Sequence, residues 1–478
     1  MKTTYILLIA LMGQVTALAQ SYQAIHGSNF AGSLSTHTNP ASGLSHPKPW
    51  DITLMGLQVG NSTNLLYLER YSLGGKDKQL LAFMKNGDFK KRLNNHLNLN
   101  ILNARIRLKN RLSIGIGANI RSATNASSSS YNFQDSLSHV NSFLLINDAN
   151  QPLQAKVLSS SWAEVYGNLS YNLLESKYII WNVGANVKAN RGLFGASVTL
   201  DNARYSRFIP SIPVYRMTDV NLAYTYSGNM DQWDPAQSLT KNLKNFLGNT
   251  EGGFSFDLGT EWYIKDQKQL ELFESKTAYN YTWKFGVSLL DLGYTQYKHG
   301  QQSRYVSGIK STNQVYDLSQ KFDSTIIDLA TFNDSLFTLV NTFNSYYRKF
   351  KIAHPTRLVV NIDRPISDVF SINAELSLPV SIFSSSKYYI MKSLASLTIT
   401  PRMEGEKYGA YMPLTINSYG NFWLGSAIKA GPLLFGIHNI LPFFQKTPYP
   451  NGGGYLAYTI SPSEKLKKIR SRDVRCPN

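Results

Sequence analysis

Long runs of alternating apolar and polar residues recur along the chain, and they restrict its fold to one built from long β-strands. In one run Leu112, Ile114, Ile116, Ala118 and Ile120 alternate with Ser113, Gly115, Gly117, Asn119 and Arg121. Similar runs lie at 181–190, 254–264, 370–378 and 408–416. Successive side chains of a strand point to opposite faces, so each run has one apolar and one polar face. These runs are about ten residues long, whereas an ordinary strand has about five or six.

The polar face of these runs carries charges in mid-strand. They are Arg121, Lys188, Asp257, Glu261 and Glu375. A strand that crosses lipid alternates lipid-facing and lumen-facing side chains over about 9–11 residues. A soluble β-sandwich also alternates, but usually with shorter strands. The pattern therefore favours an all-β chain forming a single transmembrane antiparallel β-barrel. The five charges are candidate lumen-lining residues, either along a permeation path or in a salt-bridge network inside a closed lumen.

The first 19 residues have the features of a cleaved export signal. Lys2 precedes the apolar segment 5–12, and Ala17-Leu18-Ala19 is a small-x-small cleavage pattern that leaves Gln20 first. After residue 20 there is no run of about 18 apolar residues, so no transmembrane helix is expected. A β-barrel is the other structure that satisfies its backbone inside lipid. The cell outer membrane is the expected location.

We expect the barrel to occupy residues 51–461, with about fourteen strands. The candidate strands are 51–60, 97–109, 111–122, 161–173, 178–190, 193–201, 252–265, 281–294, 355–364, 368–379, 393–400, 407–417, 421–430, 432–440 and 453–461. The alternation changes phase at Ile101-Leu102, which predicts a β-bulge there.

The links between strands fall into two classes by length. Short links at 109–110 and 175–177 fit periplasmic turns. Long links, expected as extracellular loops, are 123–160, 202–251, 265–280 and 295–354. Residues 315–350 lack Pro and are mostly apolar and acidic, so a helical excursion is expected there. It would be a lid or partner-docking element, or an ordered loop that covers the barrel mouth.

Two segments lie outside the predicted barrel. Residues 20–50 are small and polar with three prolines, and would be a periplasmic segment or a plug or hatch inside the lumen. Residues 462–478 form a basic tail. The whole chain has 48 Lys and Arg against 30 Asp and Glu, a net charge of +18. Such a balance suits nucleic acid or anionic lipid; the export signal favours outer-membrane lipid and lipopolysaccharide, and no nucleic-acid partner is expected.

No motif of a known catalytic centre is present in the sequence. There is no P-loop, no His-Glu-x-x-His and no Gly-x-Ser-x-Gly, and the eight histidines are scattered. His438-Asn439 beside a strand has no assignable serine partner. We expect no catalytic, cofactor or metal site, and therefore no enzyme.

The chain resembles a known group of barrels. Asn39-Pro40-Ala41, just ahead of the first predicted strand, resembles the Asn-Pro-Ala motif of FadL-type and PorV-type barrels, although Ser42 is inserted before Gly43-Leu44. The motifs at 253–259, 289–293, 406–414, 430–432 and 437–440 resemble an uncharacterised family of Bacteroidota outer-membrane proteins. The resemblance implies a FadL-like barrel of about fourteen strands, but no particular ligand.

Two functions remain open at this point. By analogy with FadL-type barrels, the chain would be a passive transporter for a hydrophobic or amphipathic small molecule, with Asn39, Pro40 and Ala41 as the candidate hatch. Alternatively it would be a non-transporting, membrane-anchored scaffold whose long loops bind a protein partner, as PorV-type members do in secretion. Fold-level analogy alone does not decide between them.

Overall fold

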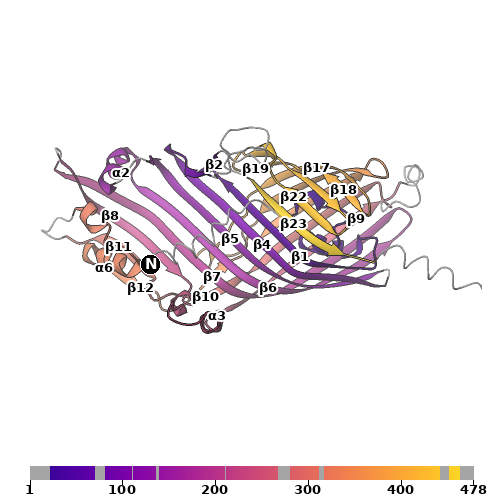
Figure 1. The fold of residues 1–478 in the computed structure, drawn as a ribbon, viewed down its shortest axis with the longest axis horizontal. Coiled ribbons are helices and arrows are strands. Elements are labelled where there is room, and N and C mark those ends of the chain that lie inside the picture. The colour runs from indigo at the N-terminus through magenta and orange to yellow at the C-terminus, as the bar shows by residue number, and fades with distance from the viewer. Residues whose placement is uncertain are drawn as a thin grey trace, which may run out of the picture.

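One antiparallel sheet closes on itself to form a barrel. The first wall strand, β1 (Trp50–Thr63), pairs on one side with β4 (Gly87–Lys109) and on the other with the last strand, β23 (Gly452–Ile460). The computed structural model describes residues 22–69, 81–109, 111–135, 139–209, 212–266, 280–311, 317–441 and 452–462. Over these residues the wall has fourteen strand positions, so the predicted all-β barrel is confirmed (Figure 1).

Several wall positions are filled by consecutive strands that a bulge or an insertion separates. Going round from β1 and β4, the positions are β5 (Leu112–Phe133), β6 (Leu153–Glu175), β7 (Ile179–Ile209), β8 (Ile212–Tyr226) with β9 (Gly252–Ile264), β10 (Trp283–Lys298) with β11 (Arg304–Ile309), β12 (Val340–Ser345) with β13 (Lys349–Ala353) and β14 (Arg357–Pro365), β15 (Phe370–Pro379), β17 (Ser396–Glu404), β18 (Tyr408–Tyr411) with β19 (Leu414–Asn417), β20 (Phe422–Leu424) with β21 (Ser426–Ala430), β22 (Leu433–Ile437), and β23. Outside this wall, β2 (Leu66–Glu69) and β3 (Leu81–Met84) form a separate hairpin, and β16 (Tyr389–Ile390) pairs in parallel with β13.

The predicted alternation separates the two faces of the wall. On the outer face Val165, Val187 and Leu258 are exposed, Val187 by 71%. Their neighbours Lys188 and Asp257 are buried in the interior. An apolar outer face around a polar interior is the reverse of a soluble protein, and it is the arrangement that a lipid-embedded barrel requires.

The predicted bulge in β4 is also present. The register between β4 and β5 shifts between Asn100 and Leu102. Ile101 and Leu102 are consequently both exposed on the outer face. The extra residue brings the apolar side chains back into phase with the outer face.

Several strands are longer than predicted. The separate strands expected at 178–190 and 193–201 are one continuous strand, β7. The loop expected at 123–160 is largely strand, because β5 continues to Phe133 and β6 begins at Leu153. Much of 202–251 likewise belongs to β7 and β8. The β5 extension, residues 123–133, is polar and rich in Ser and Asn. Pairing with β4 and β6 makes it a strand although its sequence has little local strand preference.

The structure places one predicted loop at the opposite end of the barrel from the one expected. Residues 265–280 were expected among the long extracellular loops. Their flanking residues Ile264 and Trp283 pair with each other, and Ile264 pairs with Ile179 beside the short turn after β6. This link therefore belongs to the end with the short turns, although residues 267–279 themselves lie outside the described part.

Helices gather at the end with the long links, where β4–β8 extend furthest (Figure 1). They are α2 (Val140–Ile146), α5 (Leu318–Lys321) and α6 (Leu329–Leu339), and the last two confirm the predicted helical excursion. Asp328 caps α6 and forms a capping box with Thr331. No helix in the described ranges is long and apolar enough to cross a membrane.

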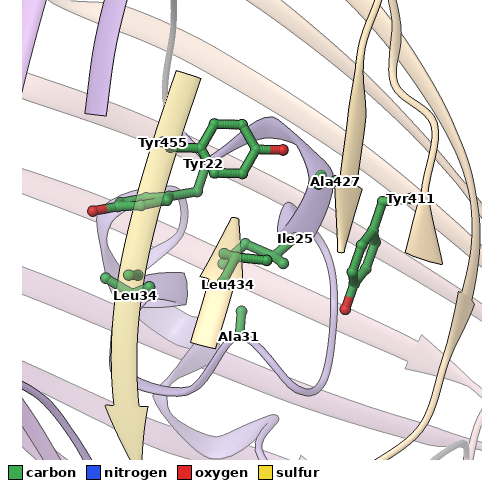
Figure 2. Close-up of a cluster of buried hydrophobic side chains, with 10 residues drawn as sticks. Tyr22, Ile25, Ala31, Leu34, Tyr411, Ala427, Leu434 and Tyr455 are labelled. Atoms are coloured by element: carbon green, nitrogen blue, oxygen red, sulfur yellow. The ribbon is translucent and has the colours of Figure 1, made fainter. Parts of the chain in front are cut away.

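The N-terminal segment lies inside the barrel. Residues 22–48, here called the plug, contain the short 3₁₀ helices η1 (Gln23–Ile25), η2 (Gly32–His37) and η3 (Pro40–Leu44). Figure 2 shows Tyr22, Ile25 and Leu34 of the plug packed against Tyr455 and Leu434 of the wall. The plug occupies the end with the short turns. The predicted signal peptide and the tail from residue 463 lie outside the described residues.

Candidate functional site: the plugged lumen

The Asn-Pro-Ala segment is a capped turn seated on the wall. Asn39 is the N-cap of η3, and its side-chain oxygen accepts a hydrogen bond of 3.0 Å from the Ala41 amide. Pro40 occupies the first helical position, where its missing N–H costs no hydrogen bond. The Asn39 Nδ2 donates to the Thr260 carbonyl at 3.0 Å. The motif therefore both shapes η3 and attaches it to β9.

Two glycines of the wall make room for this turn. Gly184 of β7 and Gly259 of β9 are paired in register. A Cβ at Gly184 would collide with the Pro40 carbonyl group, and one at Gly259 would collide with Asn39 and Pro40. Gly259 is the last residue of the motif at 253–259, which reads Gly-x-x-x-Asp-Leu-Gly. Two sequence motifs of the resemblance therefore meet at this contact.

Polar wall residues hold the carbonyl groups of the plug. Ser170 Oγ donates to the Pro40 carbonyl at 2.7 Å, and Asn168 Nδ2 donates to the same oxygen at 3.1 Å. On the opposite side Lys284 contacts the Gly27 carbonyl, and Arg402 donates to the His26 carbonyl at 2.9 Å. Side-chain hydrogen bonds rather than strand pairing therefore join the described plug to the wall.

Glu261 and Glu375 each bind the plug. Glu261 accepts hydrogen bonds from Ser42 at 2.5 Å and from Ser45 at 2.9 Å. Glu375 lies 2.8 Å from the His26 ring nitrogen Nδ1. Two of the five candidate lumen residues are thus contacts of the plug.

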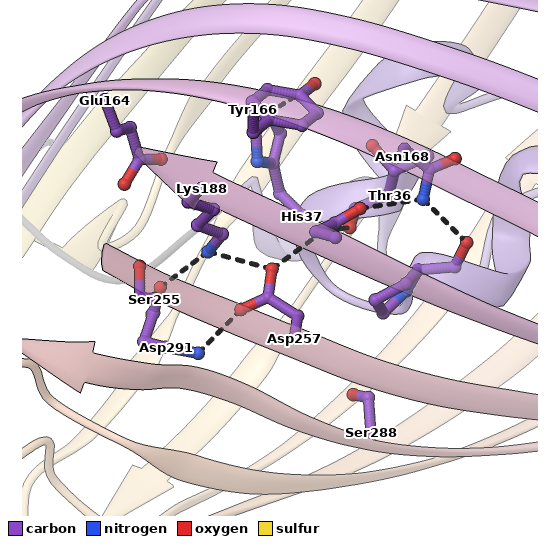
Figure 3. A network of polar contacts seen from close by, with 12 residues as sticks. Thr36, His37, Glu164, Tyr166, Asn168, Lys188, Ser255, Asp257, Ser288 and Asp291 are labelled. Atoms are coloured by element: carbon purple, nitrogen blue, oxygen red, sulfur yellow. Dashed lines mark hydrogen bonds and ion pairs between the residues drawn. The ribbon is translucent and has the colours of Figure 1, made fainter. Parts of the chain in front are cut away.

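The other three candidates, Arg121, Lys188 and Asp257, meet in a buried cluster beside the plug. Figure 3 shows Lys188 and Asp257 of this cluster together with Asp291. Lys188 Nζ lies 2.8 Å from both Asp257 Oδ2 and Asp291 Oδ1. Arg121 Nη2 donates to Asp291 Oδ2 at 2.9 Å, and its Nη1 lies 3.5 Å from Glu164 Oε2. In this structure the charges pair with one another across the lumen, and a part in permeation stays a prediction.

Asp291 and Glu164 also belong to this cluster, and neither was among the predicted site residues. Asp291 is the one described non-glycine residue with positive φ, at 59°, and it sits at a bulge of β10 between Leu289 and Leu292. The bulge lets the Asp291 amide donate to Asp257 Oδ1 at 2.7 Å. Two features of the sequence could have identified them as interior residues. Asp291 lies in the motif at 289–293, which contains Asp-Leu-Gly, and Glu164 lies on the polar face of the strand predicted at 161–173.

His37 of the plug lies beside this cluster. Its ring packs edge-on against Tyr166, with the centroids 5.1 Å apart. Burial, together with the nearby cations Lys188 and Arg121, lowers the pKa of His37 to about 4, although Glu164 acts in the opposite direction. His46, near the end of the plug, is also buried, which lowers its pKa to about 3. Both rings are therefore neutral at neutral pH.

A second segment closes the lumen on the other side of the cluster. The link 380–395 between β15 and β17 buries Met391 and Leu394. The Lys392 amide donates to Asn125 Oδ1 at 2.8 Å, and the Lys392 carbonyl accepts from Asn94 at 3.1 Å. Met391 packs in an apolar cluster with Trp162 and Ile352.

A small cavity remains between the plug and this link. It has a volume of about 70 Å³ and is lined by Leu34 and His37 of the plug, Arg121 and Lys188 of the wall, and Leu394 of the link. Pockets for small organic ligands usually measure roughly 300–1,000 Å³. This cavity is therefore too small for such a ligand and has room only for a few water molecules.

No group of three or more His, Cys, Asp or Glu side chains in the described ranges is arranged to hold a metal ion.

The fold and the contents of the lumen together define the class of protein. It is a fourteen-stranded β-barrel whose lumen is closed by its own N-terminal plug. Residues 40–438 match a family described as a family of unknown function (DUF5723), and the chain belongs to that family. No curated protein matches the chain.

Three solved structures are similar over most of their length. The toluene transporter TbuX of Ralstonia pickettii has 9% identity and a TM-score of 0.41, with 90% of this chain and 94% of that chain covered. A FadL homologue of Pseudomonas aeruginosa has 8% identity and a TM-score of 0.42, with 93% and 98% covered. The toluene transporter TodX of P. putida has 8% identity and a TM-score of 0.42, with 91% and 95% covered.

Proposed function

We propose that the protein is a passive outer-membrane channel whose closed state is held by the N-terminal plug, and that it admits a hydrophobic or amphipathic small molecule. The outer-membrane location is supported by a closed wall with an apolar outer face, since a closed barrel leaves no unpaired sheet edge in lipid. The solute class rests on the resemblance to FadL-type barrels. Outer-membrane lipid and lipopolysaccharide would surround the wall.

The observation that carries this proposal is how the plug is attached. Apart from the apolar cluster around Tyr22, Ile25 and Leu34, many of its contacts with the wall are hydrogen bonds and ion pairs. Examples are the hydrogen bonds of Ser42 with Glu261 and of Ser33 with Thr53. Water can replace such partners at small net free-energy change when the plug moves, because each net hydrogen bond contributes only about 0.5–1.5 kcal/mol. A wall whose interior remains polar without the plug is suited to a water-filled lumen.

The orientation follows from the two ends of the barrel. Short turns in outer-membrane barrels face the periplasm and long loops face outwards. The plug lies at the short-turn end, so it would control exit to the periplasm. The link 380–395 closes the lumen from the outer side, and passage therefore requires both segments to move.

A reversible disulfide between plug and wall tests the proposal. The hydroxyls of Ser33 and Thr53 are 3.0 Å apart, so S33C/T53C in a C476S background should lock the plug. The matched control is T124C/S159C, which joins β5 to β6 across hydroxyls 2.8 Å apart without touching the plug. Entry of N-phenyl-1-naphthylamine, an apolar fluorophore that lipopolysaccharide excludes, is measured in outer-membrane vesicles with and without dithiothreitol.

We expect the oxidised S33C/T53C barrel to admit the fluorophore no faster than vesicles without the protein, and reduction to restore entry. The control pair should admit it equally in both states. Equal entry through the oxidised and reduced S33C/T53C barrels would reject the plug as a gate.

A membrane-anchored scaffold is the second candidate function. At the long-loop end α6 packs on β8, β11 and β12 around Val306 and Leu336, leaving Ile327 and Phe337 exposed at the surface. Such apolar residues suit a protein partner. A partner recovered with the native barrel in mild detergent but absent with I327S/F337S would support this role.

A further inference from the structure

The barrel wall is interrupted on one flank by an insertion that contains a helix. β8 and β9 occupy the same wall position, and residues 227–251 leave the wall between them. Within this insertion α3 (Leu239–Gly248) lies against the outside of the barrel (Figure 1). No predicted function accounts for a helix at this place.

Arg191 of β7 joins the last turn of α3 to the barrel, and contacts within the insertion order the start of the helix. Ser238 caps its first turn by accepting from the Lys241 amide. At its last turn Arg191 of β7 donates to the Leu247 carbonyl at 3.0 Å, where a cation is favoured. The buried Asn242 donates to the Asp234 carbonyl at 2.7 Å. The helix is therefore held in one orientation.

One side of α3 is apolar and uncovered. Leu239, Leu243 and Leu247 follow one another at four-residue spacing, which places them on one helix face. They are 65%, 44% and 47% exposed. Three exposed leucines on a rigidly attached helix form a continuous apolar stripe.

This stripe continues the apolar outer band of the wall. The chain rejoins the wall at Gly252, and the next outward side chains of β9 are the exposed Phe254, Leu258 and Ile264. Because β9 runs toward the short-turn end, α3 lies at the opposite boundary of the band. On the proposed orientation that is the outer leaflet.

Lysines lie on α3 and near its end. Lys241 and Lys244 are on α3 and are exposed. Lys298 and Lys349 pair with Glu251, three residues after α3, at 3.5 Å and 2.8 Å, and each is about half exposed. These lysines outnumber the nearby carboxylates Glu251 and Asp234, so the surface has a net positive charge that complements the phosphate groups of an anionic leaflet.

We propose that α3 is an in-plane membrane anchor that inserts Leu239, Leu243 and Leu247 into the outer leaflet and binds lipid phosphate through its lysines. An amphipathic helix with basic residues on its polar face lies at the boundary between headgroups and acyl chains, about 5–10 Å deep. This inference rests on the proposed outer-membrane location. It adds a lipid-binding surface outside the lumen.

Quenching by lipid nitroxides tests the anchor in the full-length protein. A bimane label is placed at L243C, at F337C on α6 as an exposed apolar control, and at V187C on the outer band, each in a C476S background. The proteins are reconstituted in phosphatidylcholine vesicles that contain lipid A and a lipid with a nitroxide in the headgroup region. We expect strong quenching at 243 and 187, and little at 337.

The outcomes separate this inference from the proposed function. Quenching at 187 with none at 243 would overturn the anchor while leaving the membrane location intact. No quenching at 187 would overturn the membrane location itself. Quenching of the 243 label gives the equilibrium constant for insertion of α3, and its ratio between lipid A vesicles and pure phosphatidylcholine vesicles measures the preference for lipid A. In a K241Q/K244Q variant this ratio should fall by roughly fivefold per lysine. An unchanged preference would overturn the phosphate contact.

Discussion

Arg105 of β4 donates a hydrogen bond of 2.7 Å from Nε to Asp51 Oδ2 of β1, and both side chains are fully buried. The same guanidinium donates to the Gly43 carbonyl at 2.9 Å and to the Lys48 carbonyl at 2.8 Å. Asp51 in turn accepts from the Ser33 amide. This one ion pair therefore joins two wall strands to Ser33 of η2 and to Gly43 of η3.

Replacing Arg105 with Met should destabilise the folded barrel by about 3–5 kcal/mol, because Asp51 is left as an unpaired buried charge. K156M is the matched control, since Lys156 pairs with Asp201 at the surface, and it should cost less than about 1 kcal/mol. Urea unfolding of the refolded protein measures both. Similar midpoints for the two variants would contradict the role given to Arg105.

The glycines under the Asn-Pro-Ala turn should be sensitive to a single methyl group. G184A places a Cβ against the Pro40 carbonyl group, and G259A places one against the side chains of Asn39 and Pro40, so the turn must shift and Ser35 of the plug should become accessible. G167A is the control, since a Cβ there meets nothing within 4 Å. The rate of thiol modification of S35C in each background measures the effect. Equal modification rates in all three variants would show that the close fit of Gly184 and Gly259 against the turn does not hold the plug.

Acid should loosen the plug. His37 and His46 have pKa values near 4 and 3 in the closed state, against 6.5 when free. Below pH about 6.5 the released plug binds protons that the seated plug does not, so closed-state stability is full above that pH and declines as the pH falls toward 4.

Modification of S35C by 4,4′-dithiodipyridine should accelerate across this pH range. The acceleration should be lost in H37Q/H46Q and kept in H139Q, whose histidine is exposed. An acid response that persists in H37Q/H46Q would assign it to other groups.

The stability of the folded barrel should depend on the carboxylate of Asp291. D291N leaves Arg121 and Lys188 with fewer anionic partners, so it should be destabilised by several kcal/mol, about the cost of breaking a buried pair. D291G relieves the positive φ but also removes the carboxylate, and it should be destabilised as well. If D291G unfolds at the urea concentration of the native protein, the backbone conformation rather than the charge is what matters.

The fold was predictable because two faces of each strand meet different surroundings. Period-two alternation over about ten residues records the lipid-facing and lumen-facing sides directly, and even the bulge at Ile101 left a phase change. The extensions of β5 and β6 above the apolar band were not predictable in this way, since 123–133 has polar residues on both faces and no alternation to read.

The site was predictable only in part. Arg121, Lys188 and Asp257 were recognised as interior charges from their phase in the strands. Their partner Asp291 lies 170 residues from Arg121 in sequence, and the strand register and bulge that bring them together are not encoded locally. The plug was identifiable as a segment that precedes the barrel strands in sequence. Which wall residues bind it could not be predicted, because that depends on the same strand register.

The seam between β1 and β23 sets an order of events in biogenesis. β1 follows the plug directly, whereas its partner strand is synthesised only at the other end of the chain. A nascent chain therefore cannot complete the ring, and the seam can close only after β23 has been made. Closure of the barrel is thus a post-translational step, and a chain cut short before Gly452 would leave two open edges available to other molecules.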